Sequence, residues 1–387
     1  MGTPNGQPDG QAAGQVRCSL AILGAGVVGC AVAQRLAPRF AHAGSRIGGG
    51  VLVLDGADRA GTGVSSRNSG VVHAGLYYPP GSRKAHTCVA GNARVWDWVA
   101  THAVEHRRCG KLVVGTGPED EAALDALVAN AAACGAELAR VSLAEARAIE
   151  PALPASVTAA AWSPRSGIVD VHGLVRSLEV AAVAGGAGGV EFAFAAGVRS
   201  ITPVAGGFEI VSARGTIVAE RVVNAAGLGA VALARSLGVE VELFPARGDY
   251  FRLRGACPWT RLIYPVVRPG SPALGVHLTL ELDGRCRLGP DLDWVDDPDD
   301  FGPARGEAKH AKFHAAAERL LGPIAPERLV YDGCGIRPKI VGPGQPAADF
   351  RVVEQPAGCW HMLGIESPGV TAALALADEL AEALGQA

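Results

Sequence analysis

The sequence predicts an α/β fold in which a Rossmann-like dinucleotide-binding domain, assembled from separate segments, is joined to a mostly antiparallel α+β domain. Three observations predict it. At 387 residues the chain is long enough for about two domains, because single hydrophobic cores seldom grow beyond about 250–300 residues. A glycine motif lies between an apolar strand and a helix near the N-terminus. Two later blocks contain strand-like runs of period two, such as GDYFRLRG and RCRLGPDL.

The glycine motif is the strongest local signal for a nucleotide. The run LAIL is followed by Gly24-x-Gly26-x-x-Gly29 and then by a helix with apolar faces. In the dinucleotide fingerprint the first glycine makes a tight turn, the second admits the pyrophosphate, and the third lets helix and strand pack closely. Val27 and Val28 begin the helix, whose free N–H groups and positive end bind phosphate. These five residues are therefore predicted to bind the cofactor.

An acidic residue ends the next predicted strand. VLVLD closes at Asp55, whose carboxylate can accept hydrogen bonds from both ribose hydroxyls. Asp55 lies 26 residues after Gly29, whereas the fingerprint expects about 20. We interpret the stretch PRFAHAGSRIGGG as a loop insertion that absorbs the excess. The pattern predicts an adenine dinucleotide.

The segment after this strand favours FAD over NAD. An NAD enzyme usually continues with another strand and helix, whereas here TGVSSRNSGVVHAG follows. A loop rich in hydroxyl and amide groups suits a ligand with a long polar middle, such as the ribityl chain of FAD.

Composition excludes several other classes of protein. The net charge of −3 and the pI of about 6.4 leave no basic surface for nucleic acid. No apolar run is long enough to span a bilayer, and residues 1–16 lack a signal-peptide core, so we expect a disordered tail. The nine cysteines form no CxxC pair, which predicts free, buried thiols in a reducing compartment. We expect no metal site, and we interpret the pairs His102/His106 and His310/His314 as solvated helix faces.

Several motifs resemble the L-2-hydroxyglutarate dehydrogenases and oxidases, within the D-amino-acid oxidase/glycine oxidase-like superfamily of FAD oxidoreductases. The resemblance begins with SSRNSGVVHAGLYYPPGSRKAHTCVAGN and continues through CGKLVVGT, SGIVDVHGL, NAAGLGA and PARGDYFRL. It ends with LIYP, LGVHLT, GIRPK and GIESPGVTAALALADEL, so it spans nearly everything after the tail.

The resemblance implies a set of further FAD contacts. A polar loop surrounds the flavin, a strand end passes the pyrophosphate, and a closing helix points its N-terminus at the flavin edge that becomes negative on reduction. His73 is expected to touch the flavin ring without a covalent bond, with covalent linkage as the alternative. The implied contacts are Ser65, Ser66, Arg67, Asn68, Ser69, Gly70, His73, Val198, Ala226, Gly227, Gly335, Arg337, Ser367, Pro368, Gly369, Val370 and Thr371.

The segments alternate between the two expected domains. We assign residues 17–100, 150–235 and 335–387 to the FAD-binding domain and residues 101–149 and 236–334 to the substrate domain.

Oxidation of a 2-hydroxy acid requires a carboxylate clamp and a base. Arg247 and Arg337 are the candidate clamps, because a guanidinium holds a carboxylate through two parallel hydrogen bonds. For Arg247 a structural ion pair is the alternative. His277 is the first choice as base, with a core histidine as the alternative. Tyr250 and Tyr264 are candidate hydrogen-bond donors to the substrate. Arg247 and Tyr264 are counted with His277 as candidate catalytic residues.

The predicted reaction is oxidation of a small 2-hydroxy acid, with L-2-hydroxyglutarate to 2-oxoglutarate as the first choice, by hydride transfer to flavin N5. An amine or amino-acid oxidase and a flavoprotein without turnover are the alternatives. Two departures from the family keep the substrate open: a shorter region between Asp291 and Tyr331, and GIESPG where NAPSPA is common. Glu366 of that loop would repel a dicarboxylate unless it is paired, and Lys84 is expected to be a solvated helix lysine, with an anion contact as the alternative.

The electron acceptor is left open among oxygen, a quinone and an electron-transfer protein. We expect a cytoplasmic protein, peripheral to the inner membrane if a quinone is the acceptor.

Overall fold

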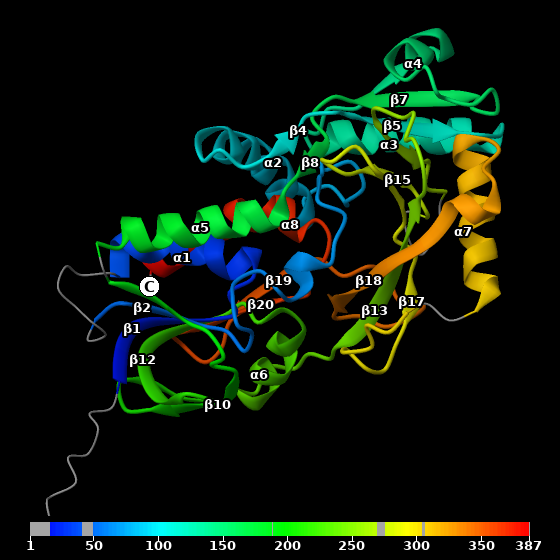
Figure 1. Cartoon of the computed structure of the whole chain (residues 1–387). Coiled ribbons are helices and arrows are strands. Elements are labelled where there is room, and N and C mark those ends of the chain that lie inside the picture. The colour runs from blue at the N-terminus through cyan, green and yellow to red at the C-terminus, as the bar shows by residue number, and fades with distance from the viewer. Residues whose placement is uncertain (1–15, 41–48, 188, 269–274, 304–305, 387) are drawn as a thin grey trace, which may run out of the picture.

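The computed structural model describes residues 16–40, 49–187, 189–268, 275–303 and 306–386. The chain forms two larger sheets, each covered by helices, which lie next to one another (Figure 1). The expected tail, apart from Val16, lies outside the described residues. None of the helices in these ranges is long and apolar enough to cross a membrane.

The first sheet has eight strands, in the order β10-β11-β12-β1-β2-β9, with β20 paired to β12 and β19 to β20. The strands are β1 (Val16–Leu23), β2 (Val51–Leu54), β9 (Val190–Ala193), β10 (Val198–Val204), β11 (Gly207–Ser212), β12 (Gly215–Asn224), β19 (Arg351–Glu354) and β20 (Cys359–Leu363). The centre of the sheet is parallel. Strand β1 pairs in parallel with both β12 and β2, and β2 pairs in parallel with β9. Parallel strands joined by a helix produce the Rossmann-like arrangement that the glycine motif predicts.

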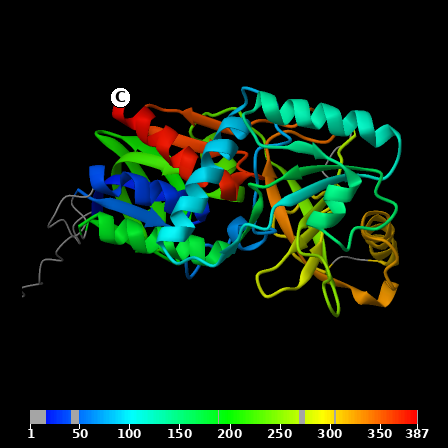
Figure 2. The ribbon, with the colours of Figure 1, turned by 90° about the horizontal axis from the view of Figure 1, so that it is seen from above.

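A layer of helices packs against this sheet. It consists of α1 (Val27–Phe40), α2 (Arg83–Thr101), α5 (Val171–Gly185) and α8 (Gly369–Gln386). Helix α8 packs against α1 and α2, and α5 packs on the other side of α1 (Figure 2). Helix α1 runs to Phe40 through Pro38, so the start of the expected loop insertion is helical, and residues 41–48 lie outside the described part of the chain.

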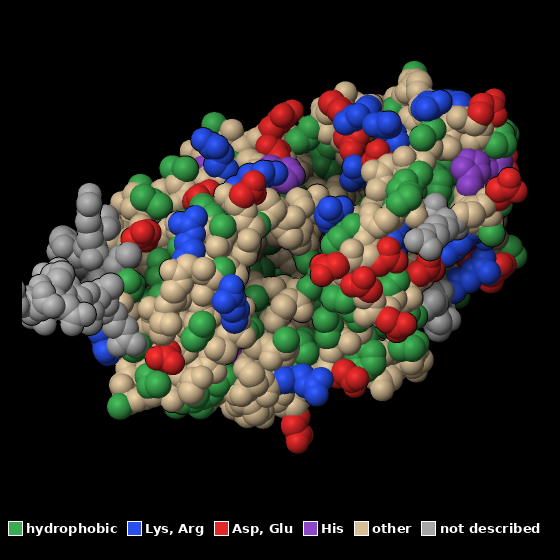
Figure 3. Space-filling model, turned by 60° about the horizontal axis from the view of Figure 1, so that its bottom comes forward, with side chains coloured by type: hydrophobic (Ala, Val, Ile, Leu, Met, Phe, Trp, Pro, Cys, Tyr) green, Lys and Arg blue, Asp and Glu red, His purple; other side chains and the backbone are tan. Residues whose placement is uncertain are grey.

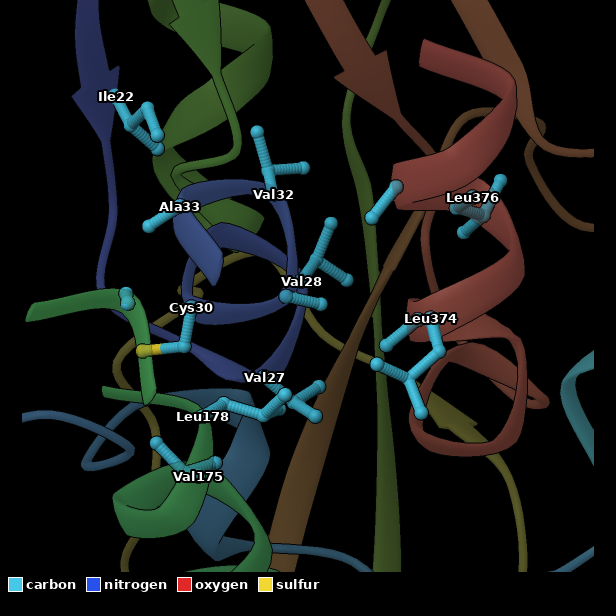
Figure 4. Close-up of a cluster of buried hydrophobic side chains, with 14 of the residues drawn as sticks. Ile22, Val27, Val28, Cys30, Val32, Ala33, Val175, Leu178, Leu374 and Leu376 are labelled. Carbon is cyan, nitrogen blue, oxygen red and sulfur yellow. The ribbon is translucent and has the colours of Figure 1, made fainter. Parts of the chain in front are cut away.

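The core of this half is built on α1. Val28 and Val32 point toward Leu374 and its neighbours on α8, whereas Val27 and Cys30 point toward α5 (Figure 4). Cys30 and Val32 are fully buried. A helix that is apolar nearly all round is buried within a core. Helix α1 is such a helix, and its packing against α5 on one side and α8 on the other fixes the position of its N-terminus.

The second sheet is mostly antiparallel, as predicted. Its order is β17-β13-β16-β15-β14-β5-β7-β6, with β18 paired to β13, and among its pairings only β14 with β5 is parallel. The strands are β5 (Lys111–Gly115), β6 (Ala139–Val141), β7 (Ala159–Ser163), β13 (Phe244–Leu253), β14 (Leu262–Pro265), β15 (Leu278–Leu280), β16 (Cys286–Leu288), β17 (Asp293–Trp294) and β18 (Leu329–Lys339).

The remaining elements surround this sheet or connect the two halves. They are the helices α3 (Glu119–Ala133), α4 (Leu143–Ile149), α6 (Ala230–Ser236) and α7 (Glu307–Leu321), and the small sheet of β3 (Val71–Val72), β4 (His106–Arg107) and β8 (Gly167–Val169). Strand β7 was expected in the FAD-binding domain but pairs with β5 in the second sheet. The division of the chain into domains stays a prediction.

One expectation about the cysteines is wrong. Cys257 and Cys286 form a disulfide, with Cα atoms 5.7 Å apart. Their separation of 29 residues gave no sign of pairing, because β16 brings Cys286 to the segment that holds Cys257 only in the folded sheet. The other seven cysteines are free; six of them are buried and Cys134 is half-buried.

Candidate active site

A cavity of about 1070 Å³ lies between the two halves of the molecule. Its walls come from the loops after β1, β2 and β12 and the start of α8 on one side, and from β13, β18 and α3 on the other. The space-filling view shows a hollow near the middle of the face presented (Figure 3). Most predicted site residues line this cavity: Gly24, Gly26, Val27, Val28, Asp55, Ser65, Arg67, Asn68, Ser69, His73, Ala226, Gly227, Tyr250, His277, Gly335, Arg337, Ser367, Pro368, Gly369, Val370 and Thr371.

The glycine motif forms the dinucleotide end of the cavity. Gly24 has φ +103°, and a Cβ there would meet the carbonyl of Ala225. A Cβ on Gly29 would collide with the Gly24 carbonyl, so Gly29 permits close packing while lying outside the described lining. The turn leads directly into the N-terminus of α1. The cradle therefore fits a pyrophosphate that needs close approach to the backbone.

Asp55 also organises this turn. Its two carboxylate oxygens accept hydrogen bonds from the backbone N–H groups of Ala25 (2.7 Å) and Ala57 (2.8 Å). The carboxylate thus fixes the loop after β1 against the end of β2, and it still reaches the cavity. A ribose contact is compatible with this position, because each carboxylate oxygen has a second lone pair.

The polar loop holds itself together as well as lining the cavity. Asn68 donates to the Ser65 carbonyl (2.7 Å) and accepts from the Gly70 N–H (2.8 Å), and Ser66 donates to the Thr62 carbonyl (2.7 Å). Three of the expected FAD contacts do not belong to the described residues that line the cavity: Ser66, Gly70 and Val198. Ser66 and Gly70 therefore shape the loop, and Val198 packs in a hydrophobic cluster of the first sheet.

The closing helix is tied to this loop. The Thr371 hydroxyl, in the first turn of α8, accepts the backbone N–H of His73 (3.0 Å). Nε2 of His73 lies 3.4 Å from the Ser367 hydroxyl oxygen. The other ring nitrogen, Nδ1, is buried and has no hydrogen-bond partner among the described residues. Burial, with Lys111 and His277 nearby, holds the pKa of His73 well below its usual value. The ring is therefore neutral and has an unused nitrogen.

His277 lies across the cavity with a defined tautomer. Its Nδ1 is 2.8 Å from the carbonyl of Gly275, and a carbonyl can only accept, so Nδ1 carries the proton. Burial lowers the pKa of His277 to about 3, and the charges of Lys111 and Arg337 add to this effect. The side chain is neutral near pH 7, and its Nε2 lone pair is available as an acceptor.

Lys111 is a residue that the sequence analysis missed. It begins β5, is fully buried, and its Nζ has no hydrogen-bond partner among the described residues. Burial lowers its pKa to about 7. The signal in the sequence was a lysine opening the apolar run KLVVG, within a motif already linked to the family.

The two candidate arginine clamps have different surroundings. Arg337 lines the cavity, donates from one terminal nitrogen to the Asp291 carbonyl (3.1 Å), and has a buried second nitrogen with no partner among the described residues. Arg247 is absent from the described lining. Its guanidinium donates hydrogen bonds to the Asp249 carboxylate, the Tyr331 hydroxyl and two backbone carbonyls. Arg337 thus has a nitrogen free to bind a carboxylate. Arg247 instead forms a structural ion pair with Asp249, which was the alternative interpretation from the sequence.

The two candidate tyrosines also differ. Tyr250 lines the cavity, and the Arg287 guanidinium lies 5.1 Å from its ring centroid. Tyr264 is fully buried behind the cavity wall, and its ring stacks on His277. Burial keeps the pKa of Tyr264 well above its usual value. Tyr250 therefore reaches the cavity, whereas Tyr264 contacts His277.

Lys84 is buried, contrary to the expectation of a solvated lysine. Its Nζ lies 3.0 Å from Oε1 of Glu366, and Nζ of Lys339 lies 2.9 Å from the same oxygen. Burial alone would raise the pKa of Glu366, but the two lysines lower it below its usual value. Glu366, which was expected to repel a dicarboxylate unless paired, thus forms ion pairs with both lysines. All three residues line the cavity.

The described residues contain one group of three carboxylates close enough for a metal: Asp249, Asp291 and Asp293. Nζ of Lys309 lies 2.8 Å from Asp249 and 2.7 Å from Asp291, and it also bonds Asp293. The ammonium takes the position that a cation would need. This network anchors Arg247 through Asp249.

The histidine pairs are not solvated faces of single helices. His102 follows the end of α2 and stacks on Trp98, while His106 lies in β4. His310 and His314 both lie on α7, but their rings bond backbone carbonyls after the helix.

Comparisons with known proteins agree with this geometry. The FAD dependent oxidoreductase (DAO) family matches residues 19–383. A mitochondrial L-2-hydroxyglutarate dehydrogenase of Arabidopsis thaliana is 34% identical over 94% of this chain and 83% of its own length. The L-2-hydroxyglutarate dehydrogenase of Escherichia coli K12 is 28% identical over 91% of this chain and 90% of its own length.

Two solved structures share the fold. They are L-α-glycerophosphate oxidase from Mycoplasma pneumoniae with FAD bound (TM-score 0.81, 20% identity, 95% of each chain) and glycine oxidase from Geobacillus kaustophilus (TM-score 0.78, 19% identity, 96% of this chain and 95% of that one). The cradle fits FAD, and the family match covers nearly the whole sequence. The chain belongs to the FAD dependent oxidoreductase (DAO) family.

Proposed function

We propose that this protein oxidises L-2-hydroxyglutarate to 2-oxoglutarate, with FAD bound in the cavity between the two sheets. The observation that carries the proposal is the pairing, on one cavity, of an arginine with an unused guanidinium nitrogen and a neutral histidine with a free lone pair. Relatives that match over most of the chain bear the name of this dehydrogenase.

When bound, FAD would supply the hydride acceptor for the α-carbon of the substrate. The protein's own contribution is to bind the acid, orient it and remove the hydroxyl proton. Arg337 is placed to bind the carboxylate next to the reacting carbon. The other terminal nitrogen of Arg337 donates to the Asp291 carbonyl, which restricts how the guanidinium can turn.

His277 is placed to take the hydroxyl proton at Nε2. The hydrogen bond from Nδ1 to Gly275 becomes stronger when the ring is charged, so it supports the protonated state that forms during the reaction. Before substrate binds, the Arg337 charge contributes to the low pKa of His277. A bound carboxylate offsets that charge and therefore raises the pKa of the base when a proton must be accepted.

The test is anaerobic reduction of the purified flavoprotein. We would follow loss of the oxidised flavin band after adding L-2-hydroxyglutarate, D-2-hydroxyglutarate, L-lactate, glycine or sarcosine separately. Rapid loss with L-2-hydroxyglutarate alone is the expected result. Reduction by glycine or sarcosine instead would assign an amine or amino-acid oxidase. A flavin that none of the compounds reduces would refute turnover of this substrate class. The electron acceptor and the cellular location stay predictions.

A further inference from the structure

The geometry points to a second carboxylate subsite, in which Lys339 and Lys84, held by Glu366, bind the distal carboxylate of a dicarboxylic substrate. This inference rests on the proposed function, since it names the feature of the substrate that the same cavity selects.

The first argument is charge. Lys84 and Lys339 both donate to Oε1 of Glu366, so two ammonium groups share one carboxylate. The side chains are 8%, 13% and 10% exposed for Lys84, Lys339 and Glu366. An ammonium has three donors, and one on each lysine is used here. The cluster therefore presents an excess positive charge and spare donors on the cavity wall, where burial makes an unpaired charge costly.

A further acid of the cavity wall, Asp349, does not cancel this excess. Its carboxylate accepts the backbone N–H groups of Arg83 and Lys84, in the first turn of α2, and the N–H of the neighbouring Phe350. Those three N–H groups and the positive end of the helix satisfy its charge locally. A ligand carboxylate remains the group that would balance the two lysines.

The second argument is spacing. Arg337 and Lys339 are two residues apart on β18, so their side chains leave the same face of the strand. Two residues of a strand span about 6.6 Å. A five-carbon diacid in an extended form places its two carboxylates at a comparable separation. Arg337 can thus hold the carboxylate beside the reacting carbon while Lys339 and Lys84 hold the other end.

The third argument is Glu366. Without it, two buried lysines would repel each other and adopt alternative rotamers. A carboxylate between them fixes both ammonium groups before the substrate arrives, which reduces the entropy lost on binding. Glu366 therefore serves as a positioning residue, and its presence is compatible with a dianionic substrate.

Calorimetric titration of the FAD-loaded protein with glutarate and with pentanoate tests this subsite. The two acids have the same carbon chain and differ in the distal carboxylate, and neither has a hydroxyl to oxidise. We expect glutarate to bind at least about tenfold more tightly, as for a charge-assisted hydrogen bond. Lys339→Met should reduce that preference to about threefold or less. Lys312→Met is the matched control, because Lys312 is half-exposed and pairs with Asp291 away from the described lining.

Equal affinities in the wild type, or an unchanged preference in a folded Lys339→Met protein, would overturn the subsite. If Lys339→Met fails to retain FAD, Lys84→Met decides. It removes the other ammonium group, so the preference for glutarate should again fall to about threefold or less, and an unchanged preference would refute the proposal. A wild type that prefers glutarate but is not reduced by L-2-hydroxyglutarate keeps the subsite and refutes the proposed reaction. Reduction without a glutarate preference refutes the subsite alone.

Discussion

The imidazole of His277 stacks on the phenol ring of Tyr264, with the ring centroids 3.8 Å apart and the planes 26° from parallel. Nζ of Lys111 lies 4.0 Å from the centroid of the same phenol ring. Strand β14, which carries Tyr264, lies between β5 and β15 in the sheet. The strand order thus places the aromatic ring between the buried amine and the candidate base, and the charge state of Lys111 influences His277.

His277→Asn should lower kcat by about 10²–10⁴-fold, the usual loss for a general base. The asparagine amide can still donate to the Gly275 carbonyl, so the local backbone should keep its shape while the basic nitrogen is lost. Steady-state kinetics with L-2-hydroxyglutarate and calorimetry with glutarate would separate chemistry from binding. His172→Asn, on the exposed side of α5, is the control. An unaffected kcat would return His277 to the role of a core histidine.

Lys111→Met should stabilise the protein near pH 7. The folded-state pKa of Lys111 is about 7, whereas the unfolded chain titrates near 10.5, so between these values the unfolded state holds a proton that the folded state lacks. Wild-type stability therefore rises with pH across this window, and the penalty is largest at or below pH 7. The variant's melting temperature should exceed that of the wild type by on the order of a few degrees at pH 7. Melts repeated toward pH 10 should show the excess shrinking; a constant excess would contradict a titrating Lys111.

Arg337→Met should weaken carboxylate binding with little effect on folding. Loss of a charge-assisted contact to the carboxylate should raise the Kd for glutarate by at least about tenfold. The measurement is calorimetry, together with a melting curve and the ratio of FAD to protein. An unchanged Kd in a folded, FAD-loaded variant would remove Arg337 from the substrate site.

Arg247→Met should show the opposite pattern. It leaves Asp249, which is 1% exposed, with Lys309 as its remaining ion-pair partner, so the free energy of unfolding should fall by about 3 kcal/mol. Glutarate affinity should stay near that of the wild type in the folded fraction. Urea unfolding measures the loss, and Arg59→Met, which removes a fully solvated pair with Asp58, should cost almost nothing. A large loss of glutarate binding with normal stability would restore Arg247 as a clamp.

The sequence was sufficient for the parts of the site that depend on local backbone geometry. The turn at Gly24 and the start of α1 are encoded by glycine spacing, because only a residue without Cβ fits beside Ala225. The FAD loop and the closing helix were likewise located from contiguous motifs. Arg337 lines the cavity, and its motif lies within a single strand, but its contact with substrate or flavin stays a prediction.

The residues that were misjudged depend on partners far away in the chain. Lys84 looked like a solvated lysine because its counter-ion Glu366 lies 282 residues later. Arg247 looked like a clamp because the Asp300 and Gly302 carbonyls that occupy it come from a different loop. Lys111 is buried in the folded protein, where β14 pairs with β5 and the rings of Tyr77 and Tyr264 lie near its Nζ. Helical or strand periodicity contains no information about such contacts.

The cavity joins chain segments from opposite ends of the sequence: Gly24 and Thr371 both line it, and α8 packs between α1 and α2. During synthesis on the ribosome, the first Rossmann strands therefore emerge long before the helix that completes their cofactor site. FAD capture must follow translation of residues beyond 371, and until then the nascent β1–α1 unit exposes an apolar helix without its cover. The timing of flavin loading, and the need to shield that helix in the meantime, follow from where α8 lies in the fold.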